Sequence, residues 1–196
     1  LRVGTHSLAD FDAFVDAAGR AGVDEIYPVL VDHTLFNGTG SDDTTSPLGE
    51  RDHPDWIRDP DRRQELIEGL TRFAAHIQAE HGNRVPWIDL CNEPFHGSAL
   101  TQSTADFEAL WSFLHDLALS VLEVPGTRVS IGFRDRATLM RCRPRLRQLK
   151  DDVEAKDRGP FADRFVLQFH YYRKHEQDPD SALAQFRVRD LLRFMR

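Results

Sequence analysis

The sequence predicts an α/β fold in which a parallel sheet is built from repeated strand–helix units, specifically a partial (β/α)8 TIM barrel. Short apolar runs alternate along the chain with longer segments of helical periodicity, which is typical of a parallel sheet. No Gly-rich phosphate loop follows an early strand, so a doubly wound nucleotide-binding domain is disfavoured. A full barrel needs about 250 residues, and this chain of 196 residues has room for about strands 2–6. We therefore expect residues 1–196 to form a single partial catalytic barrel.

The first elements follow from apolar periodicity and its boundary residues. Residues 7–20 are predicted to form a helix that Ser7 caps and Gly22 ends. The apolar stripe of this helix consists of Phe11, Phe14, Val15 and Ala18. Residues 26–32 (IYPVLVD) are apolar on both faces, as expected of a strand in a parallel sheet. A long polar loop over 33–58 separates this strand from the next helix.

The second helix and the strand behind it have clear signals. Asp59 is expected to cap the helix, with Pro60 at its first position, and Gly82 follows its end. Its buried face is predicted to contain Leu66, Ile67, Leu70, Phe73, Ala74 and Ile77. Residues 85–91 (VPWIDLC) form the next expected strand, which leads directly into Asn92.

The second half of the chain continues the alternation. A helix is expected from Ser103 or Thr104 onward, and a strand over 128–133 (RVSIGF). The helix stripe is predicted to comprise Phe107, Leu110, Trp111, Leu114, Leu117 and Val121. Residues 136–150 have helical periodicity, but Pro144 is expected to shorten or break that helix. The Arg-rich surface of this segment is interpreted as a solvated helix face, not a phosphate-binding one.

A last strand and helix complete the pattern, and polar residues gather behind the strands. Residues 165–170 (FVLQFH) are predicted to form a strand and residues 180–195 a helix. In barrels the working residues lie at the carboxyl ends of strands. The polar residues at these ends are Thr5, His6, Asp32, His33, Asn37, Asn92, Glu93, His96, Arg134, Asp135, His170, Tyr171 and Tyr172.

The sharpest motif is the run Cys91-Asn92-Glu93-Pro94 at the end of a predicted strand. A carboxylic acid beside an amide at this position suits acid/base work on a sugar. The acid can protonate the leaving oxygen, and the amide can hydrogen-bond a hydroxyl beside the reacting carbon. Hydrogen bonds to the 2-hydroxyl that strengthen in the transition state contribute several kcal/mol in this chemistry.

The segment WIDLCNEPF resembles the fourth-strand signature of the clan of retaining glycoside hydrolases that includes the family 5 cellulases and mannanases. The resemblance covers residues 25–175. It implies that Glu93 is the general acid/base and Asn92 the partner of the 2-hydroxyl. It also matches His33 to a histidine after strand three, and His170 with Tyr172 to a His-x-Tyr pair after strand six. In such an enzyme these side chains would bind the sugar, and Tyr172 would also orient the nucleophile.

The resemblance sets the expected activity and its missing partner. In this clan the nucleophile is a glutamate after strand seven, which we expect beyond residue 196; Glu176 lies too close to strand six. Retaining hydrolysis needs two carboxyl groups about 5–5.5 Å apart. We therefore expect an O-glycosyl hydrolase that cleaves β-glycosidic bonds in oligo- or polysaccharides and is inactive without that glutamate. His96 is a further candidate for substrate binding, and no metal or organic cofactor is expected.

Two alternatives use the same residues differently. A metal-dependent barrel enzyme is possible if His33, Glu93 and His170 converge, although no close-spaced ligand motif supports it. A non-catalytic carbohydrate-binding barrel is the other alternative, and it follows if no carboxylate occupies the nucleophile's position.

The composition limits the expected partners further. The chain is 40% hydrophobic with two cysteines and a formal net charge of -7. It has no apolar run of roughly 20 residues, so a membrane is not an expected partner. Binding to nucleic acid needs a basic face, so the net negative charge argues against nucleic acid as a partner.

Overall fold

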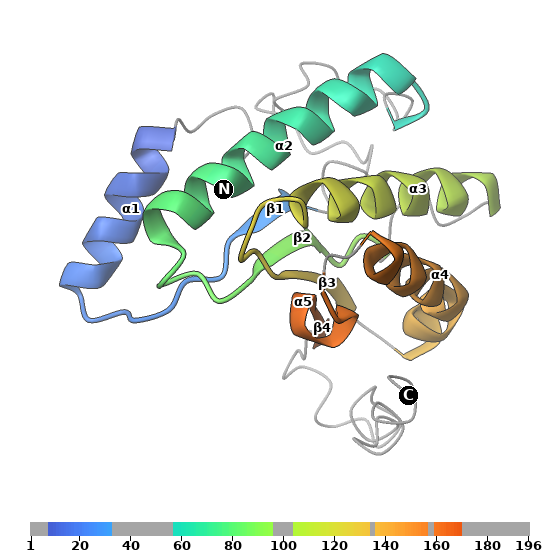
Figure 1. Ribbon diagram of the computed structural model, residues 1–196. Coiled ribbons are helices and arrows are strands. Elements are labelled where there is room, and N and C mark those ends of the chain that lie inside the picture. Colours follow the sequence, from blue (N-terminus) through green and yellow to red (C-terminus); the bar gives the residue numbers. More distant parts are fainter. Residues whose placement is uncertain (1–7, 33–56, 96–103, 134–135, 157–158, 170–196) are drawn as a thin grey trace, which may run out of the picture.

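The computed structural model describes residues 8–32, 57–95, 104–133, 136–156 and 159–169, which form an α/β fold (Figure 1). The elements in chain order are α1 (Leu8–Arg20), β1 (Val29–Asp32), α2 (Pro60–His81), β2 (Ile88–Asn92), α3 (Thr104–Val121), β3 (Val129–Phe133), α4 (Arg136–Ala155), α5 (Phe161–Arg164) and β4 (Phe165–Phe169). Residues 1–7, residues 33–56 of the loop predicted over 33–58, and the helix predicted over 180–195 lie outside the described residues.

The four strands form one parallel sheet whose spatial order is β1-β2-β3-β4. Crossovers between parallel strands are right-handed in almost all proteins. A strand order that never reverses therefore brings the connecting helices to the same face of the sheet. A doubly wound sheet reverses its order and carries helices on both faces. The predicted α/β class with a parallel sheet is thus confirmed, and closure of the sheet into a barrel stays a prediction.

The two faces of the sheet differ in chemistry. Side chains alternate along each strand, and residues paired in register share a face. One face carries large buried apolar side chains, namely Leu30, Ile88, Leu90, Val129, Ile131, Phe133 and Phe165. Phe133 of this face packs near Phe95, whose ring stacks on Trp111 of α3. The opposite face carries smaller and polar residues, namely Val29, Val31, Asp89, Cys91, Ser130, Gly132, Val166 and Gln168.

Helices α2 and α3 lie side by side, as Figure 1 shows. The Thr71 and Ser120 hydroxyls form a 2.8 Å hydrogen bond between them, and Arg63 pairs with Asp116 at 3.1 Å. The predicted cap of α2 is confirmed, because Asp59 Oδ1 accepts hydrogen bonds from two backbone amides of the first turn. The stripe predicted for α3 is buried throughout.

Helix α1 ends as predicted, but its apolar stripe is only partly buried. Gly22 has φ 80°, and the Val23 amide donates to the Ala18 carbonyl at 2.9 Å, which is a Schellman ending. Phe11 and Val15 are buried, whereas the side chain of Phe14 is 58% exposed. The expectation that the whole stripe packs against the core is therefore wrong at Phe14, whose side chain no element among the described residues covers.

The prediction of a short or broken helix around Pro144 is also wrong. Helix α4 runs for 20 residues with Pro144 inside it. A proline inside a helix costs about 3 kcal/mol through one lost hydrogen bond and a steric clash. Buried side chains on both sides of the proline offset this cost, and they are Leu139, Cys142, Leu146, Leu149 and Val153. Packing on the rest of the protein therefore overrides the local signal.

The strand boundaries shift by a few residues from those predicted. Strand β1 starts at Val29 instead of residue 26, and β2 starts at Ile88 instead of residue 85. Pro28 and Pro86 precede these starts and lack a backbone N–H, so they cannot donate to the sheet. The Pro28 carbonyl nevertheless accepts a 2.9 Å hydrogen bond from the Asp89 amide. The short helix α5 was not expected.

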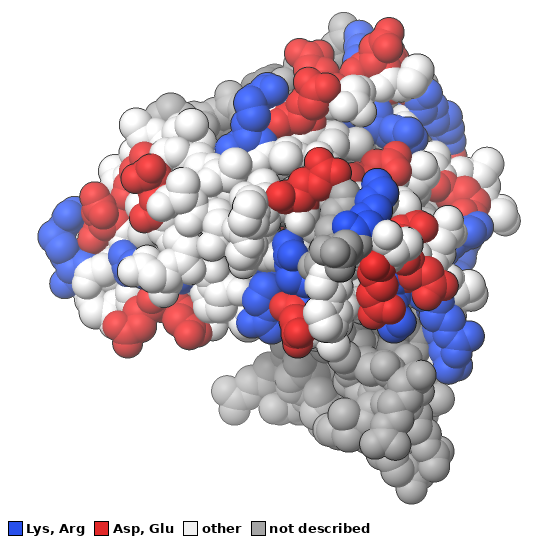
Figure 2. Space-filling view, in the orientation of Figure 1, with Lys and Arg blue, Asp and Glu red and all other residues white. Residues whose placement is uncertain are grey.

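Acidic and basic side chains are interspersed over the face that Figure 2 shows. Some of them join helices, as Arg145 of α4 does by pairing with Glu108 of α3 at 2.6 Å. Within the described part of the chain, no helix combines the length and the apolar character needed to cross a bilayer.

Candidate functional site

Glu93 occupies an unusual place at the carboxyl end of β2. Its side chain is buried, with 5% of the residue exposed, and Asn92 before it is half-buried as the last residue of the strand. Its backbone φ is 48°, the one positive φ at a non-glycine residue among those described. The left-handed region costs an L-residue roughly 1–2 kcal/mol. The following Pro94 disfavours it further, because a residue before proline prefers an extended backbone.

Aromatic packing fixes the chain directly after this residue. Phe95 is buried against Phe107 and Trp111 of α3, with ring centroids 5.1 and 6.0 Å away, and against Phe133 of β3 at 6.4 Å. The guanidinium of Arg141 lies 3.9 Å from the centre of the Phe107 ring. The chain directly after Glu93 is therefore anchored on α3 and β3, which can hold a strained backbone in place.

The carboxyl ends of the strands meet at one edge of the sheet. Asp32 pairs with Asn92 across β1 and β2, and Phe133 pairs with Phe169 across β3 and β4. Glu93 follows one of these paired residues directly. In the sequence His33, Arg134 and His170 follow the other three.

The structure describes only part of the predicted site. Glu93 and Asn92 lie together at the edge of the sheet, as the sequence predicts. The other candidates for substrate binding lie outside the described residues, and they are His33, His96, His170 and Tyr172.

A polar layer that the sequence analysis missed lies on the less apolar face of the sheet. Asp89 of β2 pairs in register with Ser130 of β3, and both are almost completely buried. The Ser130 hydroxyl donates a 3.1 Å hydrogen bond to Gln168 Oε1 of β4. We call Asp89, Ser130 and Gln168 the sheet polar layer. It crosses three strands on the face of the sheet that also carries Cys91, which lies two residues before Glu93.

Burial dominates the chemistry of Asp89. Neither carboxyl oxygen of Asp89 has a hydrogen-bond partner among the described residues. Desolvation raises the pKa of Asp89 from 3.8 to about 7. The Ser130 hydroxyl and the backbone of Cys91 and Gly132 lie close enough to oppose this shift, without the geometry of a full hydrogen bond. Asp89 is thus a buried carboxyl that exchanges its proton near neutral pH.

The sequence did contain a signal for this layer. An aspartate inside an apolar parallel strand is the informative exception, because charged residues are almost never fully buried without a partner. Ser130 and Gln168 interrupt two further apolar strands in the same way. The alignment of all three depends on the strand register, which the sequence alone does not supply.

Comparisons with known proteins assign no function to this site, so its chemistry alone supports one. No family model matches the chain, and neither curated proteins nor solved structures give a match. A buried carboxyl on a rigid turn at the carboxyl end of a parallel strand is suited to directed proton transfer. Asp89, whose pKa burial raises to about 7, lies on the preceding strand, four residues before Glu93.

Proposed function

We propose that this chain carries the acid/base half of a retaining glycoside hydrolase that cleaves β-glycosidic bonds in oligo- or polysaccharides. The observation that carries the proposal is Glu93, a buried carboxyl held on a left-handed backbone between Asn92 and Pro94 at the end of β2. Strain of this kind persists where the surrounding structure fixes a residue for a task. The parallel sheet with its unreversed strand order supports a (β/α)8 barrel as the scaffold. Barrel enzymes carry their catalytic groups at the carboxyl ends of the strands, where Glu93 lies.

In the proposed reaction Glu93 acts twice. It first donates its proton to the glycosidic oxygen as the bond from that oxygen to the anomeric carbon breaks. A carboxylate nucleophile forms the new bond to the anomeric carbon, giving a glycosyl-enzyme. Glu93 then takes a proton from water as the water attacks the anomeric carbon and releases the nucleophile. In this reaction Asn92 hydrogen-bonds the 2-hydroxyl, and no metal takes part in either step.

The nucleophile in this proposal is a glutamate outside residues 1–196. The described residues contain no carboxylate assigned to that role. The sugar in the reacting subsite would also contact His33, His170 and Tyr172, each of which follows a strand in the sequence. These assignments rest on the resemblance of the WIDLCNEPF segment to the fourth-strand signature.

The decisive experiment measures hydrolysis of aryl β-glycosides by the full-length protein and by its Glu93→Gln variant. We expect the variant to lose about 10²–10⁴-fold in rate on substrates with poor leaving groups. The loss should shrink for activated phenols, because they leave with little help from a proton. Glu65→Gln, an exposed carboxylate on α2, is the matched control and should retain full activity.

Two results would contradict the proposal. One is a Glu93→Gln variant as active as the wild type, which would remove the acid/base role from this residue. The other is a full-length protein that binds oligosaccharides but cleaves none of the panel, which would indicate a carbohydrate-binding barrel instead.

A further inference from the structure

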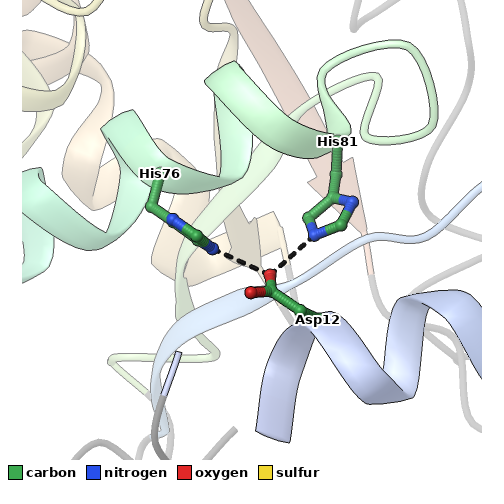
Figure 3. A group of neighbouring side chains, drawn as sticks. All are labelled: Asp12, His76 and His81. Atoms are coloured by element: carbon green, nitrogen blue, oxygen red, sulfur yellow. Dashed lines mark hydrogen bonds and ion pairs between the residues drawn. The ribbon is translucent and has the colours of Figure 1, made fainter. Parts of the chain in front are cut away.

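Three possible metal ligands converge from two helices, as Figure 3 shows. Asp12 lies on α1, and His76 and His81 lie on α2. The Nε2 atoms of His76 and His81 are 2.8 and 2.7 Å from the same atom, Asp12 Oδ1. One ligand atom from each residue lies within 4.8 Å of the others. Both imidazoles therefore point at a single carboxylate.

This cluster lies far from Glu93. Helix α2 ends at His81, and β2 starts at Ile88 after a short turn. The cluster is thus at the amino end of β2, whereas Glu93 follows its carboxyl end. The five residues of β2 span about 16 Å. A ligand bound at the cluster would not contact the proposed reacting sugar.

The surroundings hold the three side chains partly out of water. The side chains of His81 and His76 are 11% and 24% exposed, and that of Asp12 is 36% exposed. The Phe11 ring lies edge-on to His81, with ring centroids 5.7 Å apart, and edge-on to Phe73 at 5.3 Å. Phe11 therefore covers one side of the His81 imidazole.

We propose that Asp12, His76 and His81 form a zinc site that joins α1 to α2. Two imidazole nitrogens and one carboxylate oxygen are a known ligand set for Zn²⁺, with water in the fourth position. In a tetrahedral site with bonds of about 2.0–2.1 Å the ligand atoms are roughly 3.3 Å apart. Small side-chain rotations around the present arrangement therefore open the space that the ion needs. We assign the ion the role of joining α1 to α2, because the cluster lies at the opposite end of β2 from Glu93.

The site gives α1 an anchor that its apolar contacts alone do not provide. Phe14 of α1 is exposed, and a further polar contact to this helix is the Arg84 guanidinium, which donates to the Val15 carbonyl at 2.8 Å. His76 and His81 lie 64 and 69 residues from Asp12 in sequence. Binding of zinc to this cluster would therefore stabilise the folded state over the unfolded one.

The test is a ZnCl₂ titration of the full-length protein, purified without a histidine tag and freed of metal by a chelator. We expect calorimetry to show one tight zinc ion that raises the melting temperature, and Co²⁺ to give the visible absorption of a four-coordinate site. Asp12→Asn, His76→Gln and His81→Gln should each weaken zinc binding by at least roughly tenfold. Asp16→Asn on α1 and His115→Gln on α3 are the matched controls and should leave this affinity unchanged.

The proposal is overturned if the wild type binds no zinc, or if the three variants bind it as tightly as the controls do. Circular dichroism checks that each variant is folded. If Asp12→Asn does not fold, His76→Gln decides the question, because His76 is the more exposed histidine of the pair. Hydrolysis assays are not needed for this decision, so the zinc site and the glycosidase proposal fail or hold separately.

Discussion

Glu93 and Asp89 lie four residues apart on the same strand and its following turn, yet different physical features single them out. Glu93 combines burial with a backbone conformation that its side chain disfavours. Asp89 combines complete burial with the lack of a hydrogen-bond partner among the described residues. Each feature has a free-energy cost, so each supports a measurement on a single residue.

The backbone at Glu93 predicts an inverted order of stability for two small side chains. Glycine adopts positive φ without steric cost, whereas alanine does not. Glu93→Gly should therefore be more stable than Glu93→Ala by about 1 kcal/mol in urea unfolding. Both variants lose the carboxyl, so the comparison isolates the backbone. At Arg147, exposed inside α4, the order should be reversed, with alanine the more stable. Equal stability of the two variants at position 93 would contradict the strain.

The raised pKa of Asp89 predicts how stability depends on pH. Between pH 3.8 and about 7 the folded state keeps this carboxyl protonated while the unfolded state ionises it. The folded state then binds more protons, so the free energy of unfolding falls as pH rises through this window and levels off above it. Across this window the free energy of unfolding should fall by on the order of 4 kcal/mol.

Asp89→Asn should remove this dependence. The variant should be more stable than the wild type at pH 8, and the difference should vanish near pH 4. Denaturant unfolding of both proteins across this range measures it. Asp16→Asn, which changes an exposed aspartate on α1, should show no such pH-dependent difference. A constant difference between Asp89→Asn and the wild type at every pH would show that Asp89 is ionised in the folded protein.

At the scale of elements, α4 shows how packing overrides a local preference. Its buried side chains lie on both sides of Pro144, and Pro144 itself is exposed. The helix continues through the proline because detaching the first half would expose Leu139 and Cys142, and detaching the second half would expose Leu146, Leu149 and Val153. The loss of one backbone hydrogen bond is the smaller term.

Pro144→Ala should therefore stabilise the protein. We expect a gain of about 2 kcal/mol, since the interior proline costs about 3 kcal/mol and its removal frees the unfolded chain by up to about 1 kcal/mol. Thermal or urea unfolding measures the change. Arg147→Ala on the same helix should stay within about 0.5 kcal/mol of the wild type. A destabilised Pro144→Ala variant would show that the proline is needed for the packing of α4.

For the whole molecule, the strand order has the largest consequence. The strands lie in the sheet in the same order as in the sequence, so every crossover brings its helix to the same face. The opposite face carries the smaller and polar side chains. The carboxyl ends of all four strands then lie along one edge, where Glu93 stands. The Asp12, His76 and His81 cluster lies at the other end, so the proposed chemistry and the proposed metal anchor are separated by the length of the strands.

Much of the local structure could be predicted because its signals are local. The cap at Asp59, the glycine ending at Gly22 and the buried stripe of α3 depend on residues within a few positions of each other. The same holds for the placement of Glu93 after an apolar strand. The starts of β1 and β2 shifted because Pro28 and Pro86 lack a backbone N–H, and α4 extends past the predicted residue 150 to Ala155.

The failures concern residues that distant segments decide. Phe14 fits an apolar stripe, but no described neighbour covers it. Pro144 breaks helices in isolation, but here packing keeps the helix intact.

By itself, then, the sequence determined the repeated strand–helix units and the motif around Glu93, because periodicity, capping and burial preference act between near neighbours in the chain. Only the tertiary structure decided that Asp89, Ser130 and Gln168 share one face, and that Asp12 meets two histidines more than 60 residues away. Register and helix packing join segments whose separation in sequence is arbitrary, and no short-range pattern records that separation.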